Sequence, residues 1–339
     1  MKPPESSVRF LISVDTEEDN WRPATENVTV ANIQEVRRFN EFVTALGLRA
    51  TYFTTYQVAR VESAAAVLME AAEDGAEIAA HLHPWNTPPY AGDPFGINTM
   101  VHNLPEELQR KKLEHLTHHH ESIFGRPPTS FRAGRYGLGH QLVKPLLELG
   151  YKVESSVTPF WDWRDYDRGP DFRGAPMARY RLSDDGMTVI HGSEDGGLVE
   201  VPLSCGYNRA DFEFWSRIDR VFRSRPLRAL KAPGLAWRTG LLRRIMLSPE
   251  IHNVEEMVEL TERLLERGLD YLQLTLHSSS LMPGLSPFTK TSSDVERLYA
   301  RIGDYVEALA RLTTPLAAVV ADFADELTPV FATNGRSGD

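Results

Sequence analysis

Histidine and carboxylate side chains recur two residues apart in two short segments of this 339-residue chain. One segment holds His81 and His83, and the other holds Asp15 and Glu17. Alternate side chains of a β-strand point to the same face, so each pair can reach one point in space. Two imidazoles and a carboxylate leave positions open for water and substrate, which suits zinc or another divalent transition ion used for hydrolysis. With a further histidine, His277, late in the chain, the pattern predicts a hydrolytic metal site.

The other histidines form a weaker pattern. The run His118-His119-His120 lies in a highly charged segment, 105–124, that predicts a helix. Two histidines there are spaced i, i+4, but no acid follows at a spacing that would complete a metal site, so we expect a solvent-exposed helix face. We interpret His191 and His252 as structural.

Alternating apolar strands and amphipathic helices must position these groups. The pattern predicts strands at 8–14, 50–54, 77–83, 129–132, 151–156, 270–276 and 315–320, and helices at 33–46, 60–73, 105–124, 140–149, 253–267 and 294–312. Such a series favours an α/β fold with a parallel sheet or barrel, in which reactive residues gather where the carboxyl ends of the strands meet. Residues 187–203 break the rhythm and predict a hairpin that turns at 195–197.

Composition restricts the class of protein. The chain is 42% hydrophobic and 25% charged, with a formal net charge of −10, which argues against nucleic acid as a partner. A single cysteine, Cys205, excludes an intrachain disulfide and suits a reducing compartment. The first fifteen residues do not match a signal peptide and no run is long enough to span a membrane, so we expect a cytoplasmic protein.

Positive charge is concentrated in one segment. Residues 217–244 hold nine Arg or Lys and one Asp, in contrast to the acidic remainder. We interpret the chain as one domain, 1–339, with a basic helical insertion at 209–250. This patch suits an anionic surface, such as lipid headgroups at the inner face of a membrane, or a lipid-linked phosphosugar. The alternative is a helical lid whose arginines are simply solvated.

Six stretches in chain order resemble the polysaccharide deacetylases of the NodB-homology type, carbohydrate esterase family 4, and most closely a WalW-like branch associated with surface-polysaccharide and lipopolysaccharide synthesis. They are SVDTEEDNW (13–21), EIAAHLHPWNTPPY (77–90), FRAGRYGLG (131–139), YKVESSVTPFWDW (151–163), LVEVPLS (198–204) and LTLHSSSLMPGLSPF (274–288). The resemblance covers most of the chain and implies a distorted (β/α)7 barrel.

The resemblance also implies roles for the residues at the matching positions. It makes Asp15 the general base and gives the metal to Glu17, His81 and His83. The same likeness implies that Arg132 pairs with Asp15, that the backbone N–H near Tyr136 helps to bind an oxyanion, and that His277 protonates the departing amine. Zinc is the divalent ion expected first.

The motifs depart from the family pattern, and these departures leave alternatives open. The family has adjacent aspartates in its first motif, so Glu18 or Asp19 can replace Glu17 as the ligand. The usual second histidine position holds Trp85, so that His83 must supply the second imidazole. Arg135 competes with Arg132, and neither Glu154 nor Asp162 can be assigned a role in the fourth motif.

These observations support three hypotheses about function. The first is a metal-dependent hydrolase that removes N-acetyl groups from an acetamido sugar of a surface polysaccharide or its lipid-linked precursor. The others are an amidase of the same fold acting on non-sugar C–N bonds and a non-catalytic carbohydrate-binding relative. Trp85, Tyr90 and Trp161 are candidates for stacking on a sugar ring.

Overall fold

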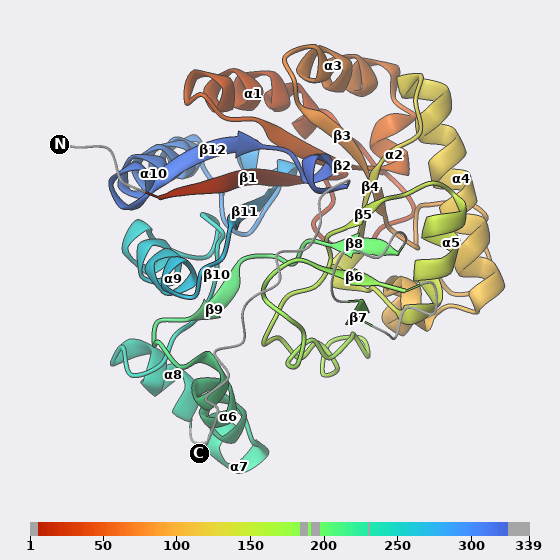
Figure 1. Ribbon diagram of the computed structural model, residues 1–339. Helices are drawn as coiled ribbons and strands as arrows, with labels where there is room; N and C mark the ends of the chain where they lie inside the picture. The colour runs from red at the N-terminus through yellow and green to blue at the C-terminus, as the bar shows by residue number, and fades with distance from the viewer. Residues whose placement is uncertain (1–5, 184–188, 191–196, 230, 325–339) are drawn as a thin grey trace.

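The computed structural model describes residues 6–183, 189–190, 197–229 and 231–324 (Figure 1). Its centre is a curled sheet of parallel strands in the order β11-β1-β2-β3-β4-β5-β8, which continues into the antiparallel strands β6 and β7. The strands of this sheet are β1 (Ser7–Thr16), β2 (Ala50–Thr55), β3 (Glu77–Leu82), β4 (Ser130–Ala133), β5 (Val153–Glu154), β6 (Tyr180–Leu182), β7 (Val189–Ile190), β8 (Leu198–Glu200), β11 (Tyr271–His277) and β12 (Thr314–Ala318). The strand β12 pairs with the first half of β1.

An irregular segment connects the two ends of the parallel series. The backbone N–H of Leu247 donates to the carbonyl of Ser204, which follows β8, at 2.8 Å. The carbonyl of Leu247 in turn accepts from the N–H of Thr275 in β11 at 2.9 Å. The sheet therefore curls round on itself, and its interior is enclosed.

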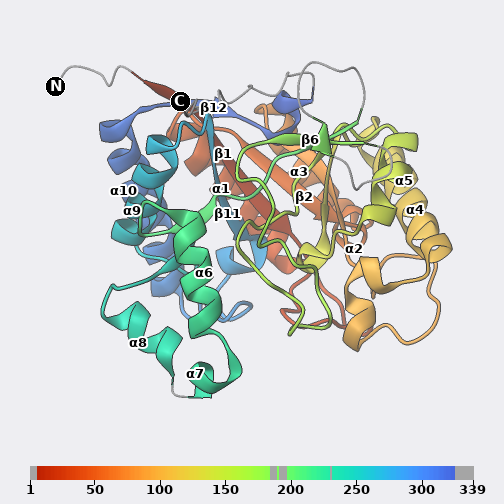
Figure 2. The same ribbon diagram turned by 60° about the horizontal axis from the view of Figure 1, so that its bottom comes forward.

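Helices cover the outside of this sheet, as Figures 1 and 2 show. The α-helices around the barrel are α1 (Val36–Ala45), α2 (Tyr56–Ala59), α3 (Glu62–Glu73), α4 (Glu106–Phe124), α5 (Val143–Glu148), α9 (Val254–Glu266) and α10 (Ser292–Leu312). The 3-10 helices are η1 (Ala31–Glu35), η2 (Gly96–Thr99), η3 (Val101–Asn103), η4 (Gly134–Tyr136), η5 (His140–Leu142), η6 (Ser278–Leu281) and η7 (Val320–Phe323).

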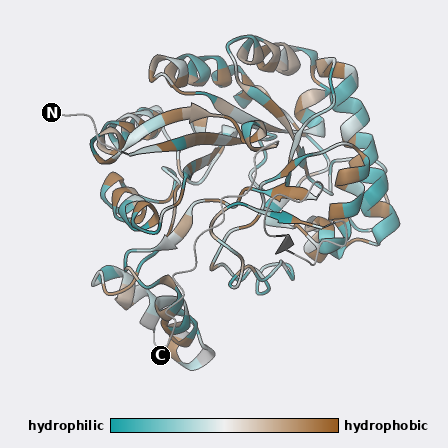
Figure 3. Ribbon diagram, in the orientation of Figure 1, coloured by the Kyte–Doolittle hydropathy of each residue, from teal (hydrophilic) through white to brown (hydrophobic). Residues whose placement is uncertain are grey.

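Local sequence signals explain where the longest helices begin and end. A capping box between Thr291 and Asp294 starts α10. Gly125, in the left-handed conformation with φ of 72°, ends α4. The buried residues of α10 are apolar or aromatic. The helix α4 buries Leu113 and Leu116 together with polar residues such as Gln109 and Thr117, and Figure 3 shows its outer side as largely hydrophilic.

The barrel interior has an apolar layer and a polar layer. Leu11, Phe53, Ala79, Val153, Val199 and Tyr271 are among the residues of the apolar layer. Two residues further along β1 and β11 stand Ser13 and Gln273, and Gln273 Nε2 donates to Ser13 Oγ at 3.1 Å. Because side chains alternate between the faces of a strand, the next inward positions are Asp15 and Thr275. The carboxyl ends of the strands therefore carry the polar layer.

A small helical unit extends from the barrel next to these carboxyl ends (Figure 2). It consists of α6 (Phe212–Phe222), α7 (Arg225–Ala229) and α8 (Ala232–Arg238), which follow one another within 209–250. At its base β9 (Cys205–Tyr207) pairs antiparallel with β10 (Arg244–Met246). Among the described residues, no helix is long and apolar enough to cross a membrane.

The structure confirms the α/β class and corrects three local predictions. The predicted hairpin at 187–203 is wrong, because β6 lies between β7 and β8 and pairs with both. The predicted helix at 60–73 is present as α3, and its first two residues connect it to a short helix, α2, that the sequence pattern did not predict. His120 is not solvent-exposed: it is 1% exposed, and its Nε2 lies 3.0 Å from the carbonyl oxygen of Thr54, whereas His118 is exposed as expected. His191 lies outside the described residues.

Candidate active site

Glu17, His81 and His83 meet at the carboxyl end of the barrel. Glu17 Oε1 lies 3.4 Å from His81 Nε2 and 3.6 Å from His83 Nε2. One ligand atom from each of the three residues falls within 4.8 Å of the others. His81 is in β3 and His83 directly follows it, so the alternation of a strand directs both imidazoles inward.

Each imidazole is held by its other ring nitrogen. His81 Nδ1 lies 3.1 Å from the backbone oxygen of Arg132, so Nδ1 carries the proton and Nε2 presents a lone pair. His83 Nδ1 lies 3.2 Å from Glu18 Oε2, and the other oxygen of Glu18 accepts from the Thr55 hydroxyl at 2.8 Å. Such outer contacts fix the orientation of metal-binding histidines.

This set of donors fits a divalent metal ion. His81 Nε2 is buried and makes no hydrogen bond within the described part of the chain, which is unusual for a polar atom unless an unseen partner binds it. Burial would lower the pKa of His83, but the carboxylates of Glu17 and Glu18 raise it to about 9. For Glu17, the two imidazoles outweigh burial and hold its pKa well below the ordinary value. Glu17, His81 and His83 are therefore the residues that would hold an ion.

Asp15 is paired with a fully buried arginine. Arg132 Nη1 donates to Asp15 Oδ1 at 2.5 Å, while Nη2 donates to Ser13 Oγ at 3.1 Å and Nε donates to the Ser155 carbonyl at 2.7 Å. Burial would raise the pKa of Asp15, but the guanidinium of Arg132 beside it outweighs burial and lowers it. Asp15 is therefore an ionised carboxylate whose Oδ2 faces the site.

His277 stands on the other side of Asp15. Because β1 and β11 pair in parallel, with Asp15 opposite His277, the two side chains leave the barrel together. His277 Nε2 lies 4.0 Å from Asp15 Oδ2, and His277 Nδ1 lies 2.9 Å from Glu250 Oε2. Burial would lower the pKa of His277, but Glu250 raises it to about 10. Asp15, Glu17 and His277 form a second group of close donor atoms.

An aromatic cavity of about 680 Å³ opens over these residues. Trp21, Trp85, Tyr136, Trp161, Trp163, Tyr166, Trp237 and Phe288 line it together with Asp15, Glu17, His83 and His277. Trp85 stacks on His83 with 4.1 Å between the ring centroids. Tyr136 has a left-handed backbone conformation with φ of 60°, and its ring stacks on Trp163.

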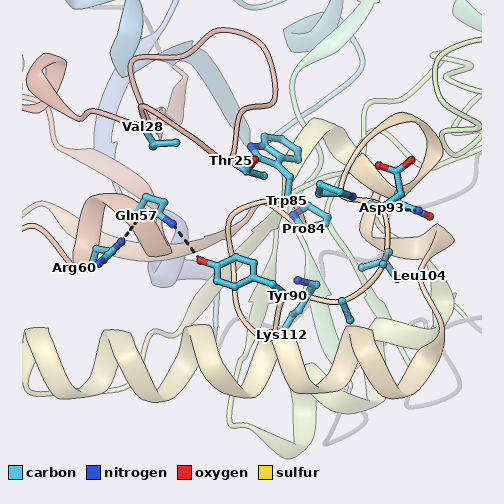
Figure 4. A pocket seen from close by; sticks show the side chains of 14 residues that line it. Thr25, Val28, Gln57, Arg60, Pro84, Trp85, Tyr90, Asp93, Leu104 and Lys112 are labelled. Carbon is cyan, nitrogen blue, oxygen red and sulfur yellow. Dashed lines mark hydrogen bonds between the residues drawn. The ribbon is translucent and has the colours of Figure 1, made fainter.

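Tyr90 is not brought into this cavity. It lies in a neighbouring cavity of about 550 Å³, in which its hydroxyl is near Gln57 and its ring is near Lys112 (Figure 4). Trp85 lines both cavities. Of the three aromatic candidates for sugar stacking, Trp85 and Trp161 therefore face the site, and Tyr90 faces the cavity beside it.

The structure distinguishes the alternatives left open by the sequence. Asp19 accepts from the backbone N–H groups of Ala31 and Asn32 and does not face the imidazoles. Arg135 donates to Asp167 at 2.7 Å, whereas Arg132 is the arginine that donates to Asp15. Glu154 lies in β5 and accepts from the backbone N–H of Ser156, also away from the site.

Asp162 lies in a cluster of ion pairs with Arg164 and Arg173, away from the metal-binding group. His252, interpreted as structural, bonds to Glu256 at 3.1 Å and stacks on Trp237. Two residues that sequence reasoning missed are Glu250, which orients His277, and Trp21, whose ring contacts His277 edge to face. No spacing rule singles out either of them.

Comparison with known proteins adds information on the fold. No protein-family model and no curated protein matches the chain. A candidate glycoside hydrolase/deacetylase from Parabacteroides distasonis has a similar solved structure: the match has a TM-score of 0.58 and 10% identity, and covers 95% of this chain and 71% of that one. This likeness shows a shared fold and agrees with the expected distorted (β/α)7 barrel.

Two further solved structures match with lower scores. A candidate polysaccharide deacetylase from Mycobacterium smegmatis has a TM-score of 0.46 and 18% identity, over 92% of this chain and 93% of that one. The peptidoglycan deacetylase PdaC from Bacillus subtilis has a TM-score of 0.40 and 12% identity, over 94% and 90% of the two chains.

Proposed function

We propose that this protein is a metal-dependent hydrolase that removes the acetyl group from an N-acetylated sugar. The observation that carries the proposal is the convergence of Glu17, His81 and His83 beside an ionised Asp15 and a tethered His277. The sequence motifs resemble carbohydrate esterase family 4, and we propose membership of its WalW-like branch on that resemblance.

The roles of the residues follow from which of their atoms are free. The chemistry that a divalent ion such as zinc would supply here is Lewis acidity, which polarises an amide carbonyl and acidifies water. Asp15 Oδ1 is bound to Arg132, so Oδ2 is the oxygen that accepts the proton of the attacking water. His277 Nδ1 is bound to Glu250, so Nε2 delivers a proton to the departing amine.

The surroundings support a sugar as the substrate. The aromatic rings of Trp85 and Trp161 line the cavity over Asp15, and such rings suit the apolar face of a pyranose. The backbone N–H of Tyr136, at the rim of the same cavity, is proposed to bind the developing oxyanion.

Metal analysis and acetate release test this proposal. The purified protein should contain about one equivalent of zinc, and chelation should abolish acetate release from N-acetylated hexosamine oligomers. Asp15→Asn should retain zinc and lose activity, because it removes the base and leaves the three ligands in place. His83→Ala should lose zinc because it removes a ligand. His118→Ala, on the exposed face of α4, is its matched control and should keep zinc. Protein that binds no zinc would support the carbohydrate-binding alternative, and zinc protein that hydrolyses only non-sugar amides would support the amidase.

We further propose that the insertion contacts an anionic membrane surface, at the cytoplasmic side, through residues 217–244. Within it, Leu235 of α8 is 64% exposed and Val221 of α6 is 54% exposed. Arg217 and Arg220, on the same helix as Val221, are exposed too. Exposed apolar and basic side chains together are typical of interfacial helices. The fraction of protein that sediments with anionic vesicles should be smaller for Leu235→Ser than for the wild type. Leu316→Ser, at a 47% exposed position on β12, should sediment as the wild type does.

A further inference from the structure

A further cavity, distinct from the one around Tyr90, lies beside the active-site cavity, between α6 and the segment 160–173. Its volume is about 1050 Å³, and its charged lining includes Asp162, Asp165, Asp219, Arg220, Arg223 and Arg244. Arg223 and Arg244 also line the cavity over Asp15 and Glu17. These two arginines therefore stand at the junction of the two cavities.

One buried carboxylate is shared by both arginines. Arg223 Nε lies 2.8 Å and 2.9 Å from the two oxygens of Asp219, and Arg244 Nη1 lies 3.6 Å from Asp219 Oδ2. Two guanidinium groups face one carboxylate, so one positive charge remains uncompensated within this cluster. Asp162 and Asp165 are the other acids that line this cavity, and Asp162 is paired with Arg164 and Arg173.

Arg244 is fixed in an environment that is costly for a charge. Its side chain is 13% exposed, its guanidinium lies 4.2 Å from the centroid of the Trp161 ring, and Nη1 donates to the carbonyl of Phe160 at 3.1 Å. Burial and the neighbouring charge of Arg223 lower the pKa of Arg244. An anion between the two guanidinium groups would relieve this repulsion.

The geometry of Arg223 leaves donors free for such an anion. Only its Nε bonds to Asp219, and within the described part of the chain neither Nη1 nor Nη2 has a hydrogen-bond partner. Arg220, on the preceding turn of α6, is exposed, lines the same cavity and has no charged partner among the residues whose positions are described. Guanidinium groups bind phosphate oxygens in pairs, which favours phosphate over a single carbonyl.

We propose that Arg223 and Arg244 bind a phosphate group of the substrate, so that the enzyme acts on a phosphorylated N-acetyl sugar. This inference rests on the proposed deacetylase function. The acetamido group then lies at Asp15, Glu17 and His277, the sugar ring lies along the aromatic wall at Trp161, and the phosphate lies at the junction of the two cavities. The phosphate can belong to a sugar phosphate or to a diphosphate linkage, since the arginines recognise the same oxygens.

Calorimetric titration separates this proposal from general charge effects. N-acetylglucosamine 1-phosphate should bind the wild-type protein about tenfold or more tightly than N-acetylglucosamine, with and without zinc, and inorganic phosphate should compete. Uridine diphosphate N-acetylglucosamine tests the diphosphate linkage in the same way. Arg223→Gln should remove most of the preference, and Arg223→Lys should restore part of it.

Arg217→Gln is the matched control, because Arg217 is an exposed arginine of the same helix that lines neither cavity. It should keep the wild-type preference within about twofold, as expected of a surface charge. Equal binding of the two sugars by the wild type, an unchanged preference in Arg223→Gln, or an equal loss in Arg217→Gln would each overturn the proposal. Acetate release from the neutral sugar reports separately on the deacetylase function.

Discussion

Glu250 holds His277 at two points. Its Oε2 lies 2.9 Å from His277 Nδ1, and its Oε1 accepts the backbone N–H of His277 at 3.0 Å. Ser280 donates to the same Oε1. The carboxylate thus fixes both the orientation of the imidazole and the end of β11. Because Nδ1 is held by Glu250, Nε2 is the nitrogen that faces Asp15. Glu250 is a positioning residue for His277.

Replacing Glu250 with Gln should lower the pKa of His277. Burial favours the neutral imidazole, and the charge of Glu250 is what raises the pKa to about 10. In the wild type His277 stays protonated through neutral pH, so in Glu250→Gln it should lose its proton at a pH at least about one unit lower. NMR titration of the metal-free protein measures this directly.

The lower pKa of His277 in Glu250→Gln should also appear in the pH dependence of catalysis. The alkaline decline of kcat/KM should move to lower pH in Glu250→Gln, and kcat should fall about 10- to 100-fold. Glu255→Gln, which changes an acid in the first turn of α9, is the control. An unchanged pKa of His277 in Glu250→Gln would contradict the assigned contact.

Much of this site could be predicted because it depends on regular structure. Strand alternation places His81 beside His83, and the parallel pairing of β1 with β11 places Asp15 beside His277. Both relations follow from local periodicity and the topology of an α/β fold. The strands and helices around the barrel were predictable for the same reason.

Other relations depend on contacts that no local pattern encodes. Glu250 reaches His277 because the chain folds back after β10, and residue spacing says nothing of that path. The turn signal at 195–197 suggested a hairpin, but β6, from an earlier segment, lies between the two strands. His120 is buried because its turn of α4 faces the Thr54 carbonyl, which is distant in sequence.

Glu18 should tune metal affinity without binding the metal. It holds His83 through Nδ1 and is itself fixed by Thr55. Glu18→Gln should weaken zinc binding about 10- to 100-fold, because an amide orients and polarises the imidazole less than a carboxylate does. Competition with a chromogenic chelator measures the affinity. Glu26→Gln, an exposed acid of the same loop, should bind zinc as the wild type does, and equal affinities for all three proteins would rule out the role of Glu18.

His120 should make the protein less stable in mild acid. Burial lowers the pKa of His120 to about 3, whereas an unfolded histidine has a pKa of about 6.5. Below pH 6.5, therefore, His120 binds a proton in the unfolded state but not in the folded state. The contribution of His120 to stability is complete above pH 6.5 and is lost progressively as the pH falls toward 3, by at most about 1.4 kcal/mol per pH unit.

His120→Gln should flatten this dependence, since glutamine can donate to the Thr54 carbonyl but does not titrate. Urea unfolding between pH 7 and 4.5 gives the free energy at each pH. His118→Gln, at an exposed position of the same helix, should keep the wild-type slope. A slope in His120→Gln as steep as that of the wild type would refute the assignment to His120.

Gly134 sets the position of His83 by having no side chain. A Cβ at this position would lie 2.5 Å from His83 Cδ2 and 2.7 Å from the Leu82 carbonyl oxygen, and both neighbours are held by the barrel. Gly134→Ala should therefore displace the His83 ring, weaken zinc binding by at least about tenfold, and cost about 1–3 kcal/mol of stability.

Gly174→Ala is the control for this substitution, because a Cβ there meets no atom within 4 Å. Chelator competition and urea unfolding of both variants measure the two effects. The loss of zinc affinity should exceed what the loss of stability explains, because the clash falls on the ring of His83 itself. Zinc affinity in Gly134→Ala equal to that in Gly174→Ala would show that His83 does not hold the metal in the orientation described.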